Sequence, residues 1–286
     1  MTVVHGPIDD PAAVRAIAQR ATTQDGIDPL SEQFLLGLDG PGPHIVVAGG
    51  YAGVVVPPAG GPGAVEAVVD PAHRGQGVGR ALIQAALAEA GDGATVWAHG
   101  DLPAACAVAA HLALTPARTL LAMRRALAGP DAAPLTVPTP SDGVRVRTYA
   151  GPGDDAAILA VNNAAFAWHP EQGGWTQEQI DERTGAEWFD PQGLFLAVDA
   201  DDRLLGFHWT KVADPGAGLG EVYVVAVAPE GQGHGLGRLL TATGLRYLAD
   251  RGLSDVELYV EGDNTAALRT YETLGFSIAQ RHVAYA

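Results

Sequence analysis

The stretch GEVYVVAVAPEGQGHGLGRLL, residues 220–240, decides the fold of this chain. Its first ten residues are rich in β-branched side chains and predict a strand, which the glycine loop follows directly. The i, i+3, i+4, i+7 spacing of one helical face comes next, in Leu236, Leu239, Leu240 and Thr243. Small residues let the backbone approach a ligand, and a helix N-terminus offers N–H groups to phosphate. The stretch therefore predicts a strand, loop and helix that bind phosphate.

The same pattern occurs twice in the chain. RGQGVGRAL at residues 74–82 matches QGHGLGRLL at residues 232–240, and residues 100–114 align without gaps to residues 262–276. Each half then runs strand, glycine loop, helix, strand, helix, strand, which is typical of an α/β fold. The segment between the halves, residues 129–143, contains four prolines. We therefore predict an N-terminal domain at residues 1–130, a linker at 131–143 and a C-terminal domain at 144–286.

Composition limits the classes of function. The 286 residues are 47% hydrophobic and 17% charged, which suits two packed domains. A net charge of −16 argues against nucleic acid or an anionic membrane as a partner. The chain has no apolar run long enough for a membrane span and no signal-peptide pattern, so we expect a cytoplasmic protein. Cys106 is the single cysteine and predicts a small buried hydrophobe in an Ala-rich helix.

Two familiar phosphate loops do not fit the glycine segment. A nucleoside triphosphate loop ends in Gly-Lys-Ser/Thr, but Arg238 follows Gly237 here. A dinucleotide fingerprint needs a further glycine, where this chain has Leu240. The nine histidines show no HExxH or paired ligand spacing, and no GxSxG motif is present. We therefore expect no metal and no serine-hydrolase chemistry.

The loop and its preceding strand resemble the acetyl-CoA motif of the GCN5-related N-acetyltransferase (GNAT) superfamily. The resemblance implies two tandem GNAT domains, each an α/β fold with a mixed, mainly antiparallel sheet flanked by helices, and acetyl-CoA as the acetyl donor. The second loop departs from many relatives by carrying Gln232 and His234 where they carry arginines. The cofactor-binding residues implied are Val225, Ala226, Val227, Gln232, Gly233, His234, Gly235, Leu236, Gly237, Arg238, Asn264 and Arg269 in the second half, with Ala67, Val68, Val69, Arg74, Gly75, Gln76, Gly77, Val78, Gly79 and Arg80 in the first.

Longer segments are similar to the mycothiol synthase family. They include NNAAFAWHPEQGGWT, WFDPQGLFLA, LLGFHWTKV and LYVEGDNTAALRTYETLGF in the second half, and TTQDGIDPLSEQFL in the first. That family acetylates the cysteinyl amine of desacetylmycothiol, a cysteine joined to glucosaminyl-inositol. The resemblance implies Glu221 as general base and Tyr271 as the acid that protonates the leaving thiolate. The substrate-binding residues implied are Glu32, Glu171, Lys211, Glu221 and Tyr259.

The two halves differ at these positions. The gapless alignment sets Tyr271 against Ala109 and Asn264 against Leu102, and Glu66 lies later on its strand than Glu221 does. We therefore expect the first half to hold acetyl-CoA without catalysing, in a monomer that acts on a small molecule.

Several alternatives remain open. Tyr271 could pack on one helical face, and Asn264 could be a bare helix cap. The chain could acetylate another small amine, such as an aminosugar or a peptide N-terminus. It could also be a non-catalytic acyl-CoA-binding module.

Overall fold

Two units make up the computed structural model, which describes residues 2–57, 61–167 and 172–286. The units do not follow the order of the chain throughout. The N-terminal unit contains Met1–Leu121, Glu261–Asp263 and Gln280–Ala286, and the C-terminal unit contains Ala122–Val260 and Asn264–Ala279. This division differs from a split at the linker because strands pair with partners that are distant in sequence. Val283 of the last strand, for example, pairs with Ala98 of the first half.

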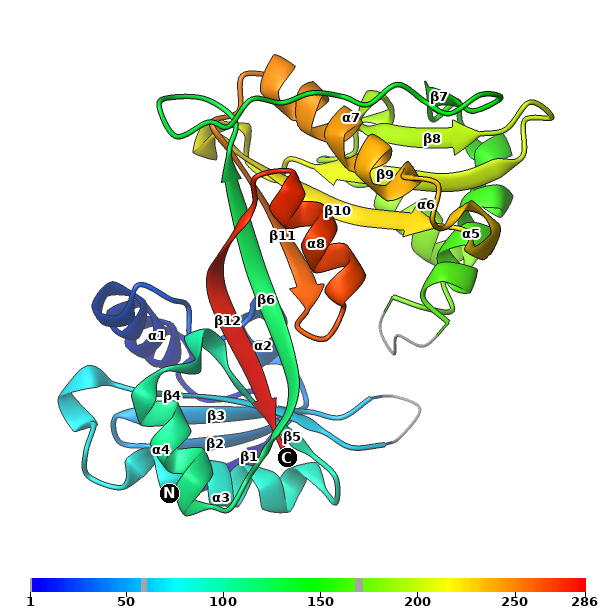
Figure 1. The fold of residues 1–286 in the computed structure, drawn as a ribbon. Helices are drawn as coiled ribbons and strands as arrows, with labels where there is room; N and C mark the ends of the chain where they lie inside the picture. Colours follow the sequence, from blue (N-terminus) through cyan, green and yellow to red (C-terminus); the bar gives the residue numbers. More distant parts are fainter. Residues whose placement is uncertain (1, 58–60, 168–171) are drawn as a thin grey trace. The chain divides into compact units, whose positions relative to one another are not determined.

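A twisted sheet with helices on both faces forms the N-terminal unit (Figure 1). Its strands lie in the order β1-β2-β3-β4-β5-β12, where β12 (Ser277–Tyr285) comes from the end of the chain. Leu82 and Ile83 of α3 pack against one face with Val54 and Val65, whereas the other face is covered by α1 and α2. The elements are β1 (Thr2–His5), α1 (Pro11–Asp25), α2 (Glu32–Leu36), β2 (Pro43–Val47), β3 (Gly50–Val55), β4 (Ala64–Val69), α3 (Val78–Ala90), β5 (Thr95–Ala98), α4 (Pro103–His111) and β6 (Pro116–Ala126).

The C-terminal unit repeats this arrangement (Figure 1). Its strands lie in the order β6-β11-β10-β9-β8-β7. Leucines of α7 pack on Phe195 and Ala197, and Ile158 of α5 and Ile180 of α6 pack with Phe207 and Trp209 on the opposite face. The second half of the chain contributes β7 (Arg145–Thr148), α5 (Asp155–Ala165), α6 (Gln177–Thr184), β8 (Leu194–Val198), β9 (Leu204–Lys211), β10 (Leu219–Val227), α7 (Leu236–Asp250), β11 (Asp255–Glu261) and α8 (Thr265–Thr273), and it ends in β12, most of which belongs to the N-terminal unit.

The element order confirms the predicted fold class. In both halves a strand, the glycine loop, a helix, a strand, a helix and a strand follow one another, as β4-α3-β5-α4-β6 and β10-α7-β11-α8-β12. Most neighbouring strands are antiparallel, whereas β4 with β5 and β10 with β11 are parallel. Each sheet is therefore mixed and mainly antiparallel. The proline-rich segment from residue 131 to 143 has neither helix nor strand.

Candidate functional site

Both glycine loops have the same backbone. Gly75 and Gly77 have φ values of 74° and 81°, and Gly233 and Gly235 have 79° and 74°. Gly77 is the N-cap of α3 and Gly235 is the N-cap of α7. This left-handed conformation favours glycine, and it leaves the first N–H groups of each helix without intrahelical partners. Together with the positive end of the helix dipole, these groups form a site suited to an anion such as a pyrophosphate.

The strand before each loop separates from its parallel neighbour. The ladder between β4 and β5 covers Ala64 and Val65, although β4 continues to Val69. The ladder between β10 and β11 covers Leu219 to Glu221, although β10 continues to Val227. Backbone groups beyond each ladder face the opening rather than the parallel strand. They can therefore pair with the amides of an extended ligand that lies between the strands.

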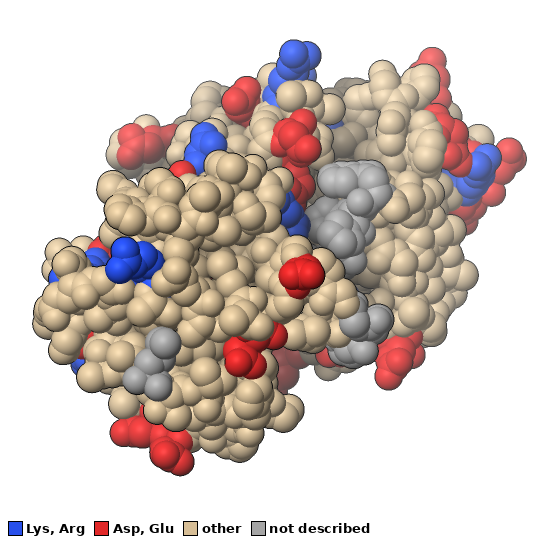
Figure 2. Space-filling view, turned by 90° about the horizontal axis from the view of Figure 1, so that it is seen from below, with Lys and Arg blue, Asp and Glu red and all other residues tan. Residues whose placement is uncertain are grey.

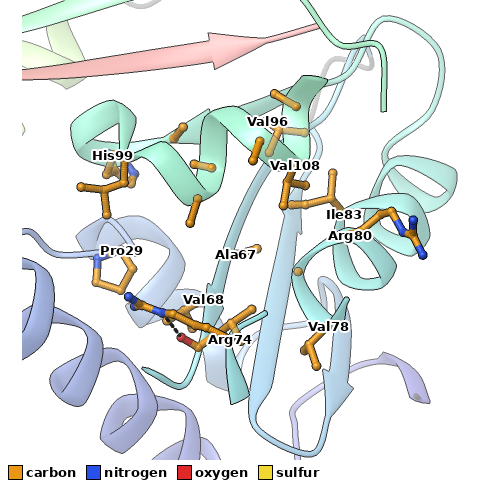
Figure 3. A pocket seen from close by; sticks show the side chains of 18 of the residues that line it. Pro29, Ala67, Val68, Arg74, Val78, Arg80, Ile83, Val96, His99 and Val108 are labelled. Atoms are coloured by element: carbon orange, nitrogen blue, oxygen red, sulfur yellow. Dashed lines mark hydrogen bonds between the residues drawn. The ribbon is translucent and has the colours of Figure 1, made fainter. Parts of the chain in front are cut away.

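In the N-terminal unit this opening is a pocket of about 560 Å³ (Figure 3). The separated strands, the glycine loop and α4 all contribute to its wall, which is mainly apolar. Its lining includes Ile27, Pro29, Ala67, Val68, Val69, Arg74, Gly75, Gly77, Val78, Gly79, Arg80, Ile83, Val96, Ala98, His99, Leu102, Val108, Ala109 and Tyr285. A pocket of this size and shape suits the pantetheine arm and pyrophosphate of a coenzyme A.

Arg74 is the basic residue most firmly held in this pocket. Its guanidinium donates to both Asp25 oxygens at 2.8 and 2.7 Å, and its Nε donates to the Val69 carbonyl at 3.3 Å. Hydrogen bonding to Asp25 raises the pKa of Arg74. Asp25 therefore offsets much of its charge, and the backbone amides of the loop remain the main anion donors. Arg80, also predicted as a contact, is exposed on the first turn of α3.

The second loop carries less positive charge. Gln232 and His234 are exposed, and Arg238 is exposed on the first turn of α7. On the face of the molecule seen in Figure 2, the basic side chains (blue) stand apart from one another, and acidic side chains (red) lie among them. That face therefore presents no continuous basic strip.

Glu221 and Lys211 lie directly opposite each other in the C-terminal unit. Glu221 on β10 pairs in register with Lys211 on β9, and Lys211 Nζ lies 3.9 Å from Glu221 Oε2. Burial raises the pKa of the Glu221 carboxyl, Lys211 opposes this rise, and the neighbouring Glu257 adds to it. A carboxylate whose pKa lies above its usual range is a suitable general base for an amine.

Two aromatic rings lie beside Lys211, and no pattern in the sequence indicated them. Lys211 Nζ lies 5.3 Å from the ring centroids of both Trp188 and Tyr223. The two rings meet edge to face with centroids 5.1 Å apart. Tyr223 lies at a register shift of β10 between Val222 and Val224. We call Trp188 and Tyr223 the aromatic seat. The alternation of residues along a strand does not reveal this bulge. Nothing in the local sequence around Trp188 indicates that its ring lies beside Lys211.

Tyr271 and Asn264 are both on α8 or at its start. Tyr271 is half-buried, and burial raises its pKa to about 12. Its ring meets Phe276 edge to face at 5.7 Å. The Asn264 side chain accepts a hydrogen bond from the Ala267 N–H at 3.1 Å, so it caps the helix. Arg269 is exposed on the same helix. The catalytic and cofactor roles of these residues stay predictions.

The other predicted substrate-binding residues that the structure describes lie on other elements than the Glu221 and Lys211 pair. Tyr259 is 50% exposed on β11, and Glu32 is exposed at the start of α2 in the N-terminal unit. Glu171 lies outside the described residues. The structure therefore brings Lys211 and Glu221 together, and the roles of the other three stay predictions. Cys106 differs from its expected burial, because it is half-exposed and its thiol donates to Asp101.

The first half lacks the counterparts of the Glu221 pair. The gapless alignment, extended back from residue 100 at the same offset, sets Thr95 against Glu257, and Ala64 pairs with Thr95 as Glu221 pairs with Glu257. Ala64 therefore occupies the position of Glu221. Across the sheet, Ala64 pairs with Val55, where Glu221 pairs with Lys211.

Glu66 interacts with a backbone N–H and a histidine of the N-terminal unit. Its side chain is 4% exposed, it accepts from the Ser31 N–H at 2.6 Å, and it lies 3.0 Å from His99 Nε2. His99 Nδ1 in turn lies 3.1 Å from His282 Nδ1. These partners account for the burial of Glu66 as part of the packing of the N-terminal unit.

Two kinds of feature are absent from the described parts of the chain. No group of three or more His, Cys, Asp or Glu side chains is placed to hold a metal ion there. Within the same residues, no helix combines the length and apolarity needed to cross a membrane.

Comparisons with known proteins agree with this geometry. The Acetyltransferase (GNAT) family model matches residues 161–276, and an Acetyltransferase (GNAT) domain model matches residues 41–112. The chain is 71% identical to a mycothiol acetyltransferase of Tsukamurella paurometabola, covering 99% of this chain and 98% of the relative. It is 55% identical to one of Nocardia farcinica, covering 96% and 93%.

A solved structure supports the fold over the whole length. A GCN5-related N-acetyltransferase from Sphaerobacter thermophilus superposes with a TM-score of 0.73 at 25% identity, covering 99% of this chain and 94% of that one. The duplicated glycine loops, the separated strands and the full-length relatives all lead to one assignment. The chain belongs to the mycothiol acetyltransferase family, and it is an N-acetyltransferase with two GNAT domains.

Proposed function

We propose that this protein transfers the acetyl group of acetyl-CoA to the cysteinyl amine of desacetylmycothiol, and that the C-terminal half catalyses the reaction. The observation that carries the proposal is the opposed pair of Glu221 and Lys211, at the point where β10 leaves β11. The names of the full-length relatives support the choice of substrate.

The donor would lie between the separated strands of the C-terminal unit. Val225, Ala226 and Val227 would pair with its pantetheine arm, and the amides from Gln232 to Arg238 would hold its pyrophosphate. The left-handed glycines and the start of α7 support this placement. Asn264 and Arg269 would contact the coenzyme from α8.

Two residues would move the protons. Glu221 accepts the proton that the amine nitrogen loses as it bonds to the acetyl carbon. Tyr271 donates its hydroxyl proton to the coenzyme A sulfur as the carbon–sulfur bond breaks. A phenol with a pKa of about 12 stays protonated throughout the working range of such an enzyme. Glu32, Glu171, Lys211 and Tyr259 would hold the hydroxyl groups of the sugar and inositol.

The N-terminal pocket would bind acetyl-CoA without turning it over. Its loop and strands, from Ala67 to Val69 and from Arg74 to Arg80, have the geometry of the second loop. Ala64 and Ala109 stand where the second half has Glu221 and Tyr271, so neither the base nor the acid is present at those positions.

An amine panel tests the proposed reaction. Release of coenzyme A thiol from acetyl-CoA would be followed with the cysteinyl glucosaminyl-inositol, with free glucosamine and with a peptide N-terminus. We expect the first amine to give a kcat/KM at least about 100-fold above the others, because its recognition uses several hydrogen bonds that the others lack. Equal rates would reject the substrate assignment. Binding of acetyl-CoA without turnover of any amine would favour a binding module instead.

A further inference from the structure

The position of Lys211 in the sheet places its side chain beside Glu221. It ends β9 and lies directly opposite Glu221, and directly opposed residues of antiparallel strands project to the same face. The two side chains are 27% and 25% exposed, so solvent screens their interaction only in part. Their charged atoms lie 3.9 Å apart. Lys211 is also the one lysine of the sequence, in a chain with sixteen arginines.

The aromatic seat holds the ammonium from the other side. Trp188 and Tyr223 each lie 5.3 Å from Lys211 Nζ, within the range of cation–π attraction. Arg183 of α6 braces the seat, because its Nε donates to the Tyr223 hydroxyl at 3.0 Å and its guanidinium stacks on Trp175 at 4.3 Å. Arg183 therefore anchors the Tyr223 ring of the seat.

The other charges around Glu221 are already paired or act against its ionisation. Glu257 on β11 lies in register beside Glu221, and Arg124 of β6 donates to Glu257 at 3.0 Å. On β10 itself the nearby titratable group is Tyr223, and from α6 it is Arg183, which bonds to Tyr223. Burial and Glu257 both favour the protonated form of Glu221. Lys211 is the nearby cation that favours the ionised form.

We propose that Trp188 and Tyr223 are positioning residues, which seat the Lys211 ammonium beside Glu221 and thereby keep Glu221 ionised as the base. This inference rests on the proposed role of Glu221. It gives Lys211 an electrostatic task that a hydrogen bond to a sugar hydroxyl would not require. It also explains why the seat is built from rings, which attract a cation without neutralising it.

The pH dependence of the rate tests this proposal. The full-length enzyme and its Lys211→Met, Lys211→Arg, Trp188→Leu and Trp188→Phe variants would be assayed with saturating acetyl-CoA between about pH 5 and pH 9. Loss of the charge in Lys211→Met should move the acidic limb of both kcat and kcat/KM to higher pH. The ratio of kcat at about pH 6 to its plateau should fall roughly fivefold or more. Trp188→Leu should move the limb in the same direction by less.

The conservative variants and controls separate this role from others. In Lys211→Arg and Trp188→Phe, the acidic limb of the pH profile should lie close to its wild-type position. Arg145→Met, which removes an exposed cation paired with Asp202 in the same unit, should leave the limb in place. Unchanged limbs in Lys211→Met and Trp188→Leu, with only a higher KM, would overturn the proposal and leave Lys211 as a substrate contact. A wild-type limb that persists in Glu221→Gln would instead reject Glu221 as the base.

Discussion

At the scale of single residues, the proposed mechanism uses two groups whose pKa values lie above their usual ranges. Burial raises the pKa of Glu221, so the carboxylate gains a proton at a higher pH than an exposed glutamate does. Activity should therefore fall as the pH decreases through that raised value. Burial raises the pKa of Tyr271 to about 12, so its hydroxyl keeps its proton at neutral and moderately alkaline pH. Tyr271 should contribute no alkaline loss of activity below about pH 10.

Removing the Tyr271 hydroxyl should slow catalysis and leave folding intact. Tyr271→Phe keeps the ring that packs on Phe276, so we expect kcat to fall about 100-fold, as for other general acids, with little change in the thermal midpoint. Tyr247→Phe is the matched control, because the Tyr247 hydroxyl bonds to Asp190 at 2.5 Å in the same unit. In that control the thermal midpoint should fall and kcat should stay unchanged. A Tyr271→Phe enzyme with wild-type kcat would leave the residue a packing role.

At the scale of elements, we expect the glycine loop to have two separable tasks, the turn into α7 and the binding of the ligand. Gly235 has a φ of 74° and begins α7 in the left-handed region, whereas Gly237 has ordinary helical geometry. A Cβ at Gly235 would meet no atom within 4 Å, so its constraint is the backbone angle and not space. Glycine patterns in the sequence indicate such a loop. They do not reveal which glycine serves the turn and which serves the ligand.

Alanine substitutions in the second loop should separate those tasks. Gly235→Ala should lower the free energy of unfolding by about 1 kcal/mol, because a residue with a Cβ is strained in this region. Gly237→Ala should leave stability unchanged or slightly higher and raise the KM for acetyl-CoA, because its methyl group would stand on the first turn of the helix that we propose faces the phosphates. Denaturant unfolding and steady-state kinetics measure the two effects. Equal stability losses in both variants would contradict the assignment.

Sequence patterns predicted the helices and strands well, but they predicted the contacts of individual side chains poorly. Helical spacing after each glycine loop predicted α3 and α7, and alternation predicted β11. The aromatic seat was missed because it depends on a bulge at Tyr223 and on a loop residue, Trp188, that long-range packing brings to Lys211. Neither follows from a local period. The pairing of Ala64 with Thr95 likewise needed the strand register.

At the scale of the whole molecule, one duplicated fold has two different sets of residues at equivalent positions. The N-terminal unit has a pocket of about 560 Å³ beside its glycine loop, and the C-terminal unit has the opposed side chains of Glu221 and Lys211. The two copies thus share the backbone of the glycine loop but differ at the positions of Glu221, Lys211 and Tyr271. The sequence alignment predicted this difference at Ala109, and the strand pairing extends it to Ala64 and Val55.

Equivalent substitutions in the two halves should have unequal effects on the rate. We expect Glu221→Gln to lower kcat by at least about 100-fold, because it removes the base. Glu66→Gln should leave kcat within about twofold and lower the thermal midpoint, because Glu66 accepts the Ser31 N–H and contacts His99 in a buried setting. Similar losses of turnover in folded samples of both variants would show that the N-terminal half also catalyses.

The return of β12 to the first half has a consequence for biosynthesis. Val283, Ala284 and Tyr285 pair with β5, whose edge is complete only when these residues have left the ribosome. Until then a nascent chain exposes an unpaired strand edge, which is a known route to misassociation. The first half should therefore finish folding last, even though it is translated first.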